Sequence, residues 1–281
     1  MQKEKNAFLE RPEVKELLHT IASLWNDGLD FHNGTDRYSS IKSAFNEYKW
    51  KYSITNEQLP SEIPSSGITF EDSSKALSAM QEKLRTSFAE DDPTGVKDNC
   101  RIILKWGGVL GSPSRGNLKY LNNPTLAGNQ PVTIIELLKI AGGVWKTAIG
   151  ELHPVPFRSN AGFTKIYSLA FDDFVIYDSR VAAALTYIIV NTFPGKIPVS
   201  MKLFMPPLRQ DKSYDISKRN PDPAFFKSVN NNDSKHFYSN VKASWLLSGA
   251  LDLIQQKEAD VTLRKLEAAL FMIGYDLRQK R

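Results

Sequence analysis

The chain holds few of the residue types that build metal centres and covalent cross-links. Among its 281 residues there is one cysteine, Cys100, which excludes an internal disulfide and a cysteine-based zinc site. The four histidines lie far apart and show neither the HxH nor the HExxH spacing of metal ligands. The sequence therefore predicts no metal and no other cofactor.

Long apolar runs and glycine-rich phosphate loops are also missing. No uninterrupted apolar stretch approaches the roughly 18 residues that a membrane-spanning helix requires. The first six residues are polar or charged, apart from the initial Met1, unlike the start of a secretion signal. We therefore expect no membrane partner and a soluble protein of the cytoplasm.

Charge is distributed unevenly along the chain. The formal net charge is +5, of which residues 1–90 carry −3 and residues 91–281 carry +8. Such asymmetry fits a body that faces a polyanion such as DNA, behind an acidic N-terminal region that binds a protein partner. The alternative is a solvated surface that happens to be basic. We divide the chain into an N-terminal helical region, 1–90, and a second domain, 91–281.

Apolar residues recur at helical spacing along most of the chain, whereas few stretches alternate as strands do. The sequence therefore predicts a mostly α-helical fold with at most one small hairpin. The stretch 111–131 is rich in turn residues and predicts a long loop, and the pair Gly142-Gly143 can interrupt a helix. Helices are expected at 8–26, 38–52, 72–88, 134–141, 144–152, 163–171, 179–192, 236–257 and 259–276. One more helix is expected after 93–95, and it ends in the run 102–108.

The run Ser159–Lys165 predicts a tight turn that leads into a helix. The unpaired backbone N–H groups of such a turn form a seat for a phosphate, and Gly162 would let the backbone approach it closely. Lys165 falls in the first helical turn, where the positive end of the helix dipole disfavours a protonated amine. A lysine that is neutral part of the time can act as a nucleophile, although the simpler alternative is a solvated surface lysine.

Asp178 follows the apolar run 174–177, which we expect to be buried, and it precedes the helix at 179–192. A carboxylate held by the backbone N–H groups of a helix start stays ionised. It can stabilise positive charge that develops on a sugar carbon. The alternative is that Asp178 only caps its helix, as most aspartates in this position do.

The residues GFTK at 162–165, followed by IYDSRV at 176–181, resemble the central motif of the helix-hairpin-helix DNA glycosylases. The likeness is greatest to the 8-oxoguanine DNA glycosylase-like branch and is specific over residues 157–190. The family's nucleophilic lysine matches Lys165, and its aspartate matches Asp178. Two features depart from the usual pattern: the hairpin has a single glycine, and the 13 positions from Lys165 to Asp178 are fewer than usual.

The resemblance implies a helical fold around a DNA-binding cleft, with the N-terminal helical region as an addition. It also implies an enzyme that flips a modified base out of DNA and removes it. In that family the lysine attacks C1′ of the deoxyribose, and the resulting Schiff base permits strand cleavage, so the expected enzyme is a bifunctional glycosylase and lyase. The alternatives are a non-catalytic DNA-binding module of a DNA-processing or phage-defence system, and an unrelated helical scaffold.

Further DNA contacts are expected on both sides of the motif. The hairpin would hold a phosphate, the flanking arginines would contact the DNA backbone, and an aromatic side chain would stack on a base or wedge into the duplex. For the aromatic residues the alternative is a place in the core. The residues are Lys105, Trp106, Arg158, Asn160, Gly162, Phe163, Thr164 and Arg180.

Overall fold

The computed structural model describes residues 2–33, 36–54, 59–147, 153–206, 218–229 and 232–278. These residues are mostly α-helical, which confirms the predicted class. The helices are α1 (Gln2–Leu9), α2 (Pro12–Asn26), α3 (Ile41–Asn46), α4 (Phe70–Ala89), α5 (Pro93–Trp106), α6 (Gly116–Asn122), α7 (Ile134–Thr147), α8 (Phe163–Ala170), α9 (Ser179–Thr192), α10 (Asp233–Gln255) and α11 (Leu263–Ile273).

Strands occur only as short antiparallel pairs in the described part of the chain. There are three such pairs, where the sequence predicted at most one. They are β1 (Phe31–Asn33) with β2 (Asp36–Tyr38), β3 (Tyr52–Ser53) with β4 (Ser66–Gly67), and β5 (Thr125–Leu126) with β6 (Gln130–Pro131).

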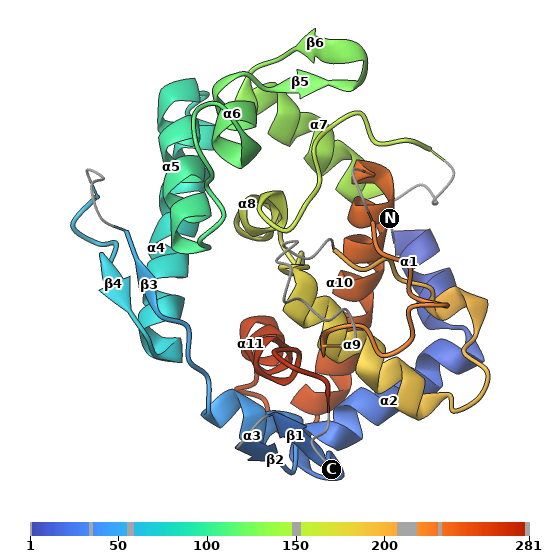
Figure 1. Ribbon diagram of the computed structural model, residues 1–281. Coiled ribbons are helices and arrows are strands. Elements are labelled where there is room, and N and C mark those ends of the chain that lie inside the picture. Colours follow the sequence, from blue (N-terminus) through green and yellow to red (C-terminus); the bar gives the residue numbers. More distant parts are fainter. Residues whose placement is uncertain are drawn as a thin grey trace.

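Helices from distant parts of the sequence surround α8 and α9 (Figure 1). On one side lie α4 to α7, with α4 packed against both α5 and α8. On the other side α10 packs against α2 and α11, and α11 packs against α3 and α9. The short α8 packs against α4 and α5, and the ring of its Tyr167 contacts Phe237 of α10, so it joins the two groups of helices. Its residues 163–169 are buried.

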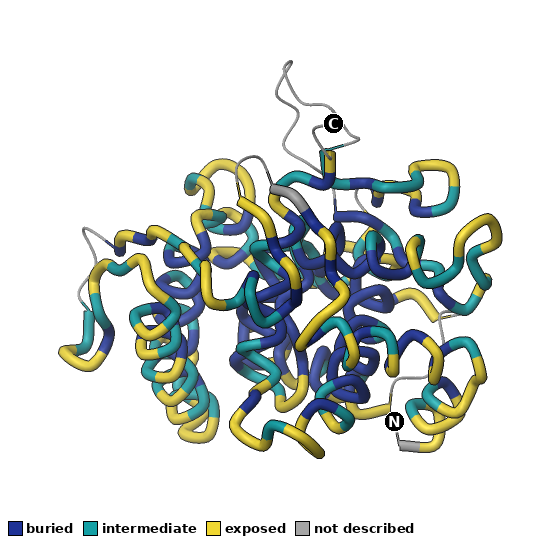
Figure 2. Tube along the Cα trace, turned by 90° about the horizontal axis from the view of Figure 1, so that it is seen from below, coloured by how far each residue is buried: buried dark blue, intermediate teal, exposed yellow. Residues whose placement is uncertain are grey.

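A single cluster of buried hydrophobic side chains extends from Phe8 to Leu277. Figure 2 shows this buried interior enclosed by exposed turns and outer helix faces. Helix α10 is buried around most of its circumference, as expected of a helix at the centre of a core. Elements from both sides of position 90 share this core, and the division into two regions at that position stays a prediction.

Several predicted boundaries differ from the structure. The helix expected at 8–26 is two helices, because the chain turns at Glu10 and Arg11 and Pro12 begins α2. Of the helix expected at 38–52, only α3 is helical, and Tyr52 belongs to β3. The long loop expected at 111–131 contains α6 and the β5–β6 pair.

Helix α7 continues through Gly142 and Gly143 to Thr147, so the interruption expected there is wrong. A glycine inside a helix costs only about 1 kcal/mol relative to alanine, which the packing of one apolar face can offset. Gly142 has a packing role, because a methyl group at that position would press on the ring of Phe171. The rest of the helix expected at 144–152 lies outside the described residues.

The two central helices agree closely with the sequence. Helix α8 begins at Phe163 and α9 begins at Ser179, each at the predicted residue. The run 174–177 between them is buried, also as predicted. No helix in the described part of the chain is long and apolar enough to cross a membrane.

Candidate functional site

The start of α8 is organised by the side chain of Asn160. Its Oδ1 accepts hydrogen bonds from the backbone N–H groups of Gly162 (2.8 Å) and Phe163 (2.9 Å). The backbone carbonyl oxygen of Asn160 accepts a hydrogen bond from the N–H of Thr164 at 3.0 Å. Lys165 is thereby fixed as the third residue of α8, in the first helical turn as predicted.

Asp178 caps α9, as the sequence predicted. Its Oδ1 accepts hydrogen bonds from the N–H groups of Arg180 (2.9 Å) and Val181 (3.2 Å). The buried strand-like run before it is anchored by side chains from other helices, because the N–H of Ile176 donates to Oε2 of Glu267 at 2.6 Å. Both Asp178 oxygens therefore have defined directions, one toward the helix start and the other toward α8.

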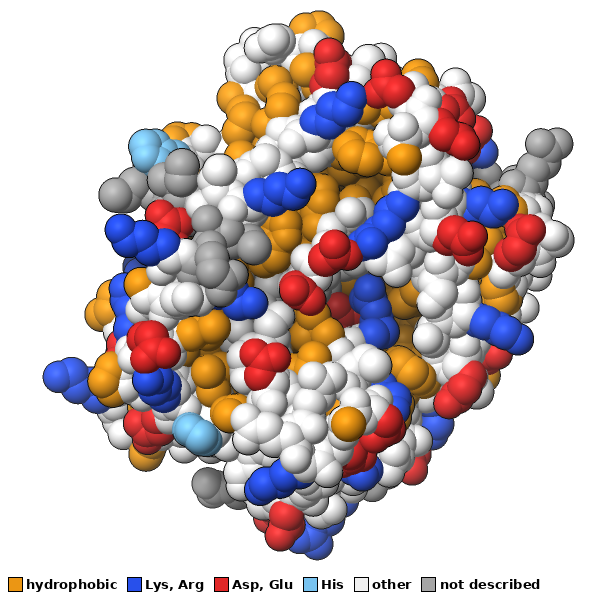
Figure 3. Space-filling model, turned by 180° about the vertical axis from the view of Figure 1, so that it is seen from behind, with side chains coloured by type: hydrophobic (Ala, Val, Ile, Leu, Met, Phe, Trp, Pro, Cys, Tyr) orange, Lys and Arg blue, Asp and Glu red, His pale blue; other side chains and the backbone are white. Residues whose placement is uncertain are grey.

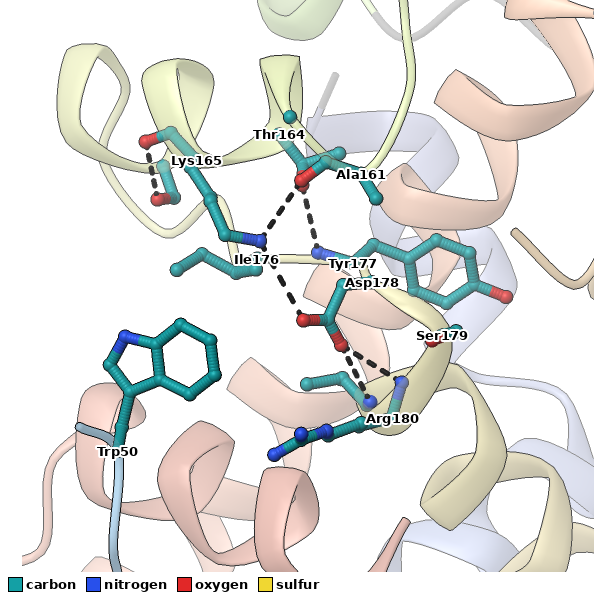
Figure 4. A network of polar contacts seen from close by, with 12 residues as sticks. Trp50, Ala161, Thr164, Lys165, Ile176, Tyr177, Asp178, Ser179 and Arg180 are labelled. Atoms are coloured by element: carbon teal, nitrogen blue, oxygen red, sulfur yellow. Dashed lines mark hydrogen bonds and ion pairs between the residues drawn. The ribbon is translucent and has the colours of Figure 1, made fainter. Parts of the chain in front are cut away.

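The Lys165 amine and the Asp178 carboxylate meet in the interior of the molecule (Figure 4). Nζ lies 3.6 Å from Oδ2, and it also donates a hydrogen bond to the carbonyl oxygen of Ala161 at 3.0 Å. The two side chains are only 6% and 15% exposed. The sequence predicted that these two residues form a pair, and in the structure their charged groups are in contact.

The charges around this pair favour an ionised Asp178. Burial alone raises the pKa of the Asp178 carboxyl, but the positive charge of Lys165 and the N–H groups of Val181 and Arg180 outweigh burial and hold the pKa below its usual value. Glu267 behaves in the opposite way, because burial raises its pKa despite the bond from Arg264. The site thus combines one strongly anionic carboxylate with one that protonates more readily.

A cavity of about 50 Å³ opens beside the pair. Lys165 and Asp178 line it together with the Arg264–Glu267 ion pair and several aromatic side chains. Trp50 is one of these and faces the pair in Figure 4. Ligand pockets usually measure roughly 300–1,000 Å³, so a nucleobase requires one wall to move. The aromatic lining residues are Tyr48, Trp50, Phe70 and Phe271.

Gly107 makes room for the Lys165 side chain. A Cβ atom at position 107 would overlap Cδ and Cε of Lys165. The backbone of Gly107 is in the ordinary right-handed region, so the absence of a side chain, rather than backbone freedom, is what the position requires. The turn after α5 therefore sets the path by which Lys165 reaches Asp178.

The predicted phosphate seat in the hairpin differs from the structure. The N–H groups of Gly162 and Phe163 already donate to Asn160, so the expectation that they are unpaired is wrong. Gly162 is in close contact with the Asn117 side chain, not with an open surface. The physical reason is local: an asparagine just before a helix start satisfies the amides that a phosphate would otherwise bind.

The residues expected to contact DNA fall into two groups. Gly162, Phe163 and Thr164 are buried, and Phe163 packs against Tyr120, so it does not present a wedge. Trp106 is buried as well and packs against Trp50 and Tyr52, which places it in the core. The half-buried group is Lys105, Arg158, Asn160 and Arg180.

The two arginines beside the motif stack on aromatic rings. The Arg158 guanidinium lies 5.4 Å from the ring centre of Tyr120. Arg180 lies over Phe271 at 4.2 Å and over Trp50 at 5.6 Å, two of the aromatic side chains that line the cavity. Of the predicted contacts, Arg180 is therefore the one that adjoins the Lys165–Asp178 pair most directly.

A second polar cluster joins the turn before α8 to the start of α10. Ser159 Oγ and His236 Nδ1 are 2.9 Å apart, and the N–H of Ser159 donates to Asp233 Oδ1 at 2.7 Å. Ser159 is 3% exposed and His236 is 1% exposed. Burial and the charge of Lys165 lower the pKa of His236 to about 3, so the ring is neutral at physiological pH.

The residues missed by the sequence interpretation come from distant elements. Trp50 and Arg264 carried no local pattern that marks a site. The stretches 104–108 and 267–271, which hold Gly107, Glu267 and Phe271, gave only weaker support to the family resemblance. Their signal is long-range packing, which a single sequence does not display. No group of three His, Cys, Asp or Glu side chains that could hold a metal occurs among the described residues.

The face of the molecule in Figure 3 carries charges of both signs. Figure 3 shows hydrophobic side chains within a hollow, with Lys, Arg, Asp and Glu side chains interspersed around it. Comparisons were also made with known proteins. Protein-family models, curated proteins and solved structures gave no match to this chain.

Proposed function

We propose that the protein is a DNA glycosylase with Schiff-base lyase activity, in which Lys165 is the nucleophile and Asp178 the stabilising anion. The observation that carries the proposal is the 3.6 Å contact between the Lys165 amine and the Asp178 carboxylate at the wall of an aromatic-lined cavity. The amine and the ionised acid come from the starts of two helices and face one space. The likeness of residues 157–190 to the helix-hairpin-helix glycosylases supports the same assignment.

The proposed reaction follows from the two groups. As the bond between C1′ and the base breaks, the base leaves with the electron pair, and the Asp178 carboxylate stabilises the positive charge on the sugar. The Lys165 ammonium first gives one proton to the departing base, which frees the nitrogen lone pair to form a bond to C1′. The C1′–O4′ bond then breaks as a second proton passes from the nitrogen to O4′, which leaves a protonated imine. Loss of a 2′ proton from this imine expels the 3′ phosphate.

Base entry requires the aromatic wall to open. Trp50 and Phe271 are half-buried and lie in edge-to-face contact, with ring centres 5.4 Å apart. Separation of these rings would enlarge the cavity and give a flipped base two faces on which to stack. Glu267 and Arg264 at the cavity wall would then offer an acceptor and a donor to the base edge.

Borohydride trapping tests the proposal. Duplexes with an abasic site or with a panel of oxidised and alkylated bases are incubated with protein and borohydride, which reduces the imine to a stable covalent link. We expect trapping with the wild type and none with Lys165→Gln, whereas Lys139→Gln, a change at an exposed lysine on α7, traps normally. Failure of the wild type to trap on every duplex contradicts the proposal.

A non-catalytic DNA-binding module is the second candidate. The small volume of the cavity favours it, because a cavity of about 50 Å³ does not hold a base without rearrangement. This alternative predicts salt-sensitive DNA binding by the wild type and by Lys165→Gln alike, with no covalent product. The same trapping experiment therefore separates the two candidates.

A further inference from the structure

Three cations gather around one half-exposed tyrosine next to the site. The ring of Tyr275, which is 45% exposed, lies 4.7 Å from the Arg180 guanidinium, 5.1 Å from Lys218 Nζ and 5.9 Å from the Arg219 guanidinium. The three positive charges repel one another, and their cation–π contacts with the Tyr275 ring partly offset this repulsion. Burial and the nearby charge of Arg219 both act to lower the pKa of Arg180, in opposition to Asp178.

The cluster is fixed to the catalytic segment. Arg219 donates from Nη1 to Ser179 Oγ at 2.7 Å, and from Nε to the carbonyl oxygen of Tyr275 at 3.2 Å. Ser179 directly follows Asp178, so Arg219 is held one residue from the candidate anion. A guanidinium has five N–H donors, and these two contacts engage two of them.

Among the described residues, the carboxylates near these cations are fewer than the cations. Asp276 lies 3.8 Å from Lys218 Nζ, but both of its oxygens also accept hydrogen bonds from Arg278. Asp178 is the other carboxylate close to Arg180, and it is paired with Lys165. Within the described part of the chain, Arg180, Lys218 and Arg219 thus lie near two carboxylates, Asp178 and Asp276, each of which already binds another cation.

We propose that Lys218 and Arg219, arranged around Tyr275 and continuous with Arg180, bind a backbone phosphate of the DNA strand beside the catalytic pocket. The inference rests on the proposed function, because a DNA strand is present only if the protein acts on DNA. A phosphate site outside the turn before α8 is required, because the N–H groups of Gly162 and Phe163 already donate to Asn160. Phosphate oxygens match the fork of Arg219, and Lys218 adds a point charge.

Salt-dependent DNA binding tests the phosphate site. The probe is a labelled duplex with a tetrahydrofuran abasic analogue, measured by fluorescence anisotropy at several salt concentrations. We expect Lys218→Ala/Arg219→Ala to bind at least about tenfold more weakly, with the slope of log K against log salt smaller by roughly one to two. The matched control Lys139→Ala, at an exposed lysine on α7, leaves both quantities unchanged.

Two further arms separate the possible results. Arg219→Lys keeps the charge and should retain the salt slope, while thermal unfolding of each variant checks that the fold is intact. Competition with ATP distinguishes a strand phosphate from a free nucleotide, and displacement of the duplex by micromolar ATP overturns the proposal. An unchanged slope in the double variant overturns it as well.

The outcomes also distinguish this inference from the proposed function. Normal trapping with an unchanged salt slope means that the chain acts on DNA but holds the strand elsewhere. A reduced slope without any trapping by the wild type means that the phosphate site is present while the glycosylase assignment is wrong.

Discussion

Two polar clusters lie near the start of α8, and only one of them borders the cavity lined by Trp50 and Phe271. The Lys165–Asp178 cluster carries full charges and borders a cavity. The Ser159–His236 cluster is sealed, and the histidine stays neutral because burial and the charge of Lys165 lower its pKa to about 3. Both are buried, so burial alone does not identify a site.

The difference lies in what surrounds each cluster. Ser159 is bonded through both its N–H and its hydroxyl group, which ties the hairpin to α10. Lys165 and Asp178 are held at 3.6 Å, a distance longer than a normal hydrogen bond, and both side chains line the cavity. We interpret the first cluster as support for the hairpin and the second as the place where chemistry occurs.

Removal of the Asp178 charge should have the largest effect on both activity and stability. Asp178→Asn keeps an oxygen to cap α9 but leaves the Lys165 ammonium without its anion. We expect base excision to slow by about 10²–10³-fold, and the free energy of unfolding to fall by roughly 3–5 kcal/mol because a buried charge loses its partner. Single-turnover cleavage and urea unfolding measure the two effects.

A double variant separates the two causes. In Lys165→Met/Asp178→Asn no lone buried charge remains, so we expect part of the stability to return while activity stays absent. If the double variant is less stable than either single variant, the interpretation of this pair as one buried charge unit is wrong.

A smaller effect is expected at Gly107, which lies against the Lys165 side chain. In Gly107→Ala the new methyl group overlaps the Lys165 stem and displaces the amine from Asp178. Misplacement of a reacting atom by about 1 Å costs on the order of 10²-fold, so we expect excision to slow by roughly 10–100-fold. The variant should also be less stable than the wild type by roughly 1–3 kcal/mol, because the overlap lies inside the buried site.

Gly143→Ala is the matched control for this change. Position 143 lies inside α7 with nothing within 4 Å of the added methyl group. We expect normal excision and a gain in stability of about 0.5–1 kcal/mol. Equal loss of activity in both alanine variants would show that the space beside Lys165 has no special role.

Local chemistry was readable from the sequence, and distant packing was not. The starts of α8 and α9 and the cap by Asp178 were predicted correctly, because caps depend on a few neighbouring residues. The hairpin amides were misjudged although Asn160 was visible, since its preference for capping competes with phosphate binding. Trp50 and Gly107 join the site only through the tertiary fold.

The pH dependence of stability tests the supporting role of the second cluster. His236 has a pKa of about 3 in the folded protein and near 6.5 when unfolded. Between these values the unfolded state binds a proton that the folded state does not, so stability falls as the pH falls from about 6.5 toward 3. The expected loss is up to about 1.4 kcal/mol per pH unit.

His236→Gln should therefore flatten this dependence while leaving excision near the wild-type rate, because the ring is sealed from the cavity that Lys165 borders. Urea unfolding at pH 4.5, 5.5 and 6.5 measures the slope, and His19→Gln, at an exposed position on α2, should leave it unchanged. Glu267 opposes the trend, since its pKa is raised by burial, so the slopes of variant and wild type are subtracted. A slope equal to the wild type, or an excision rate as low as that of Asp178→Asn, would remove the distinction between the two clusters.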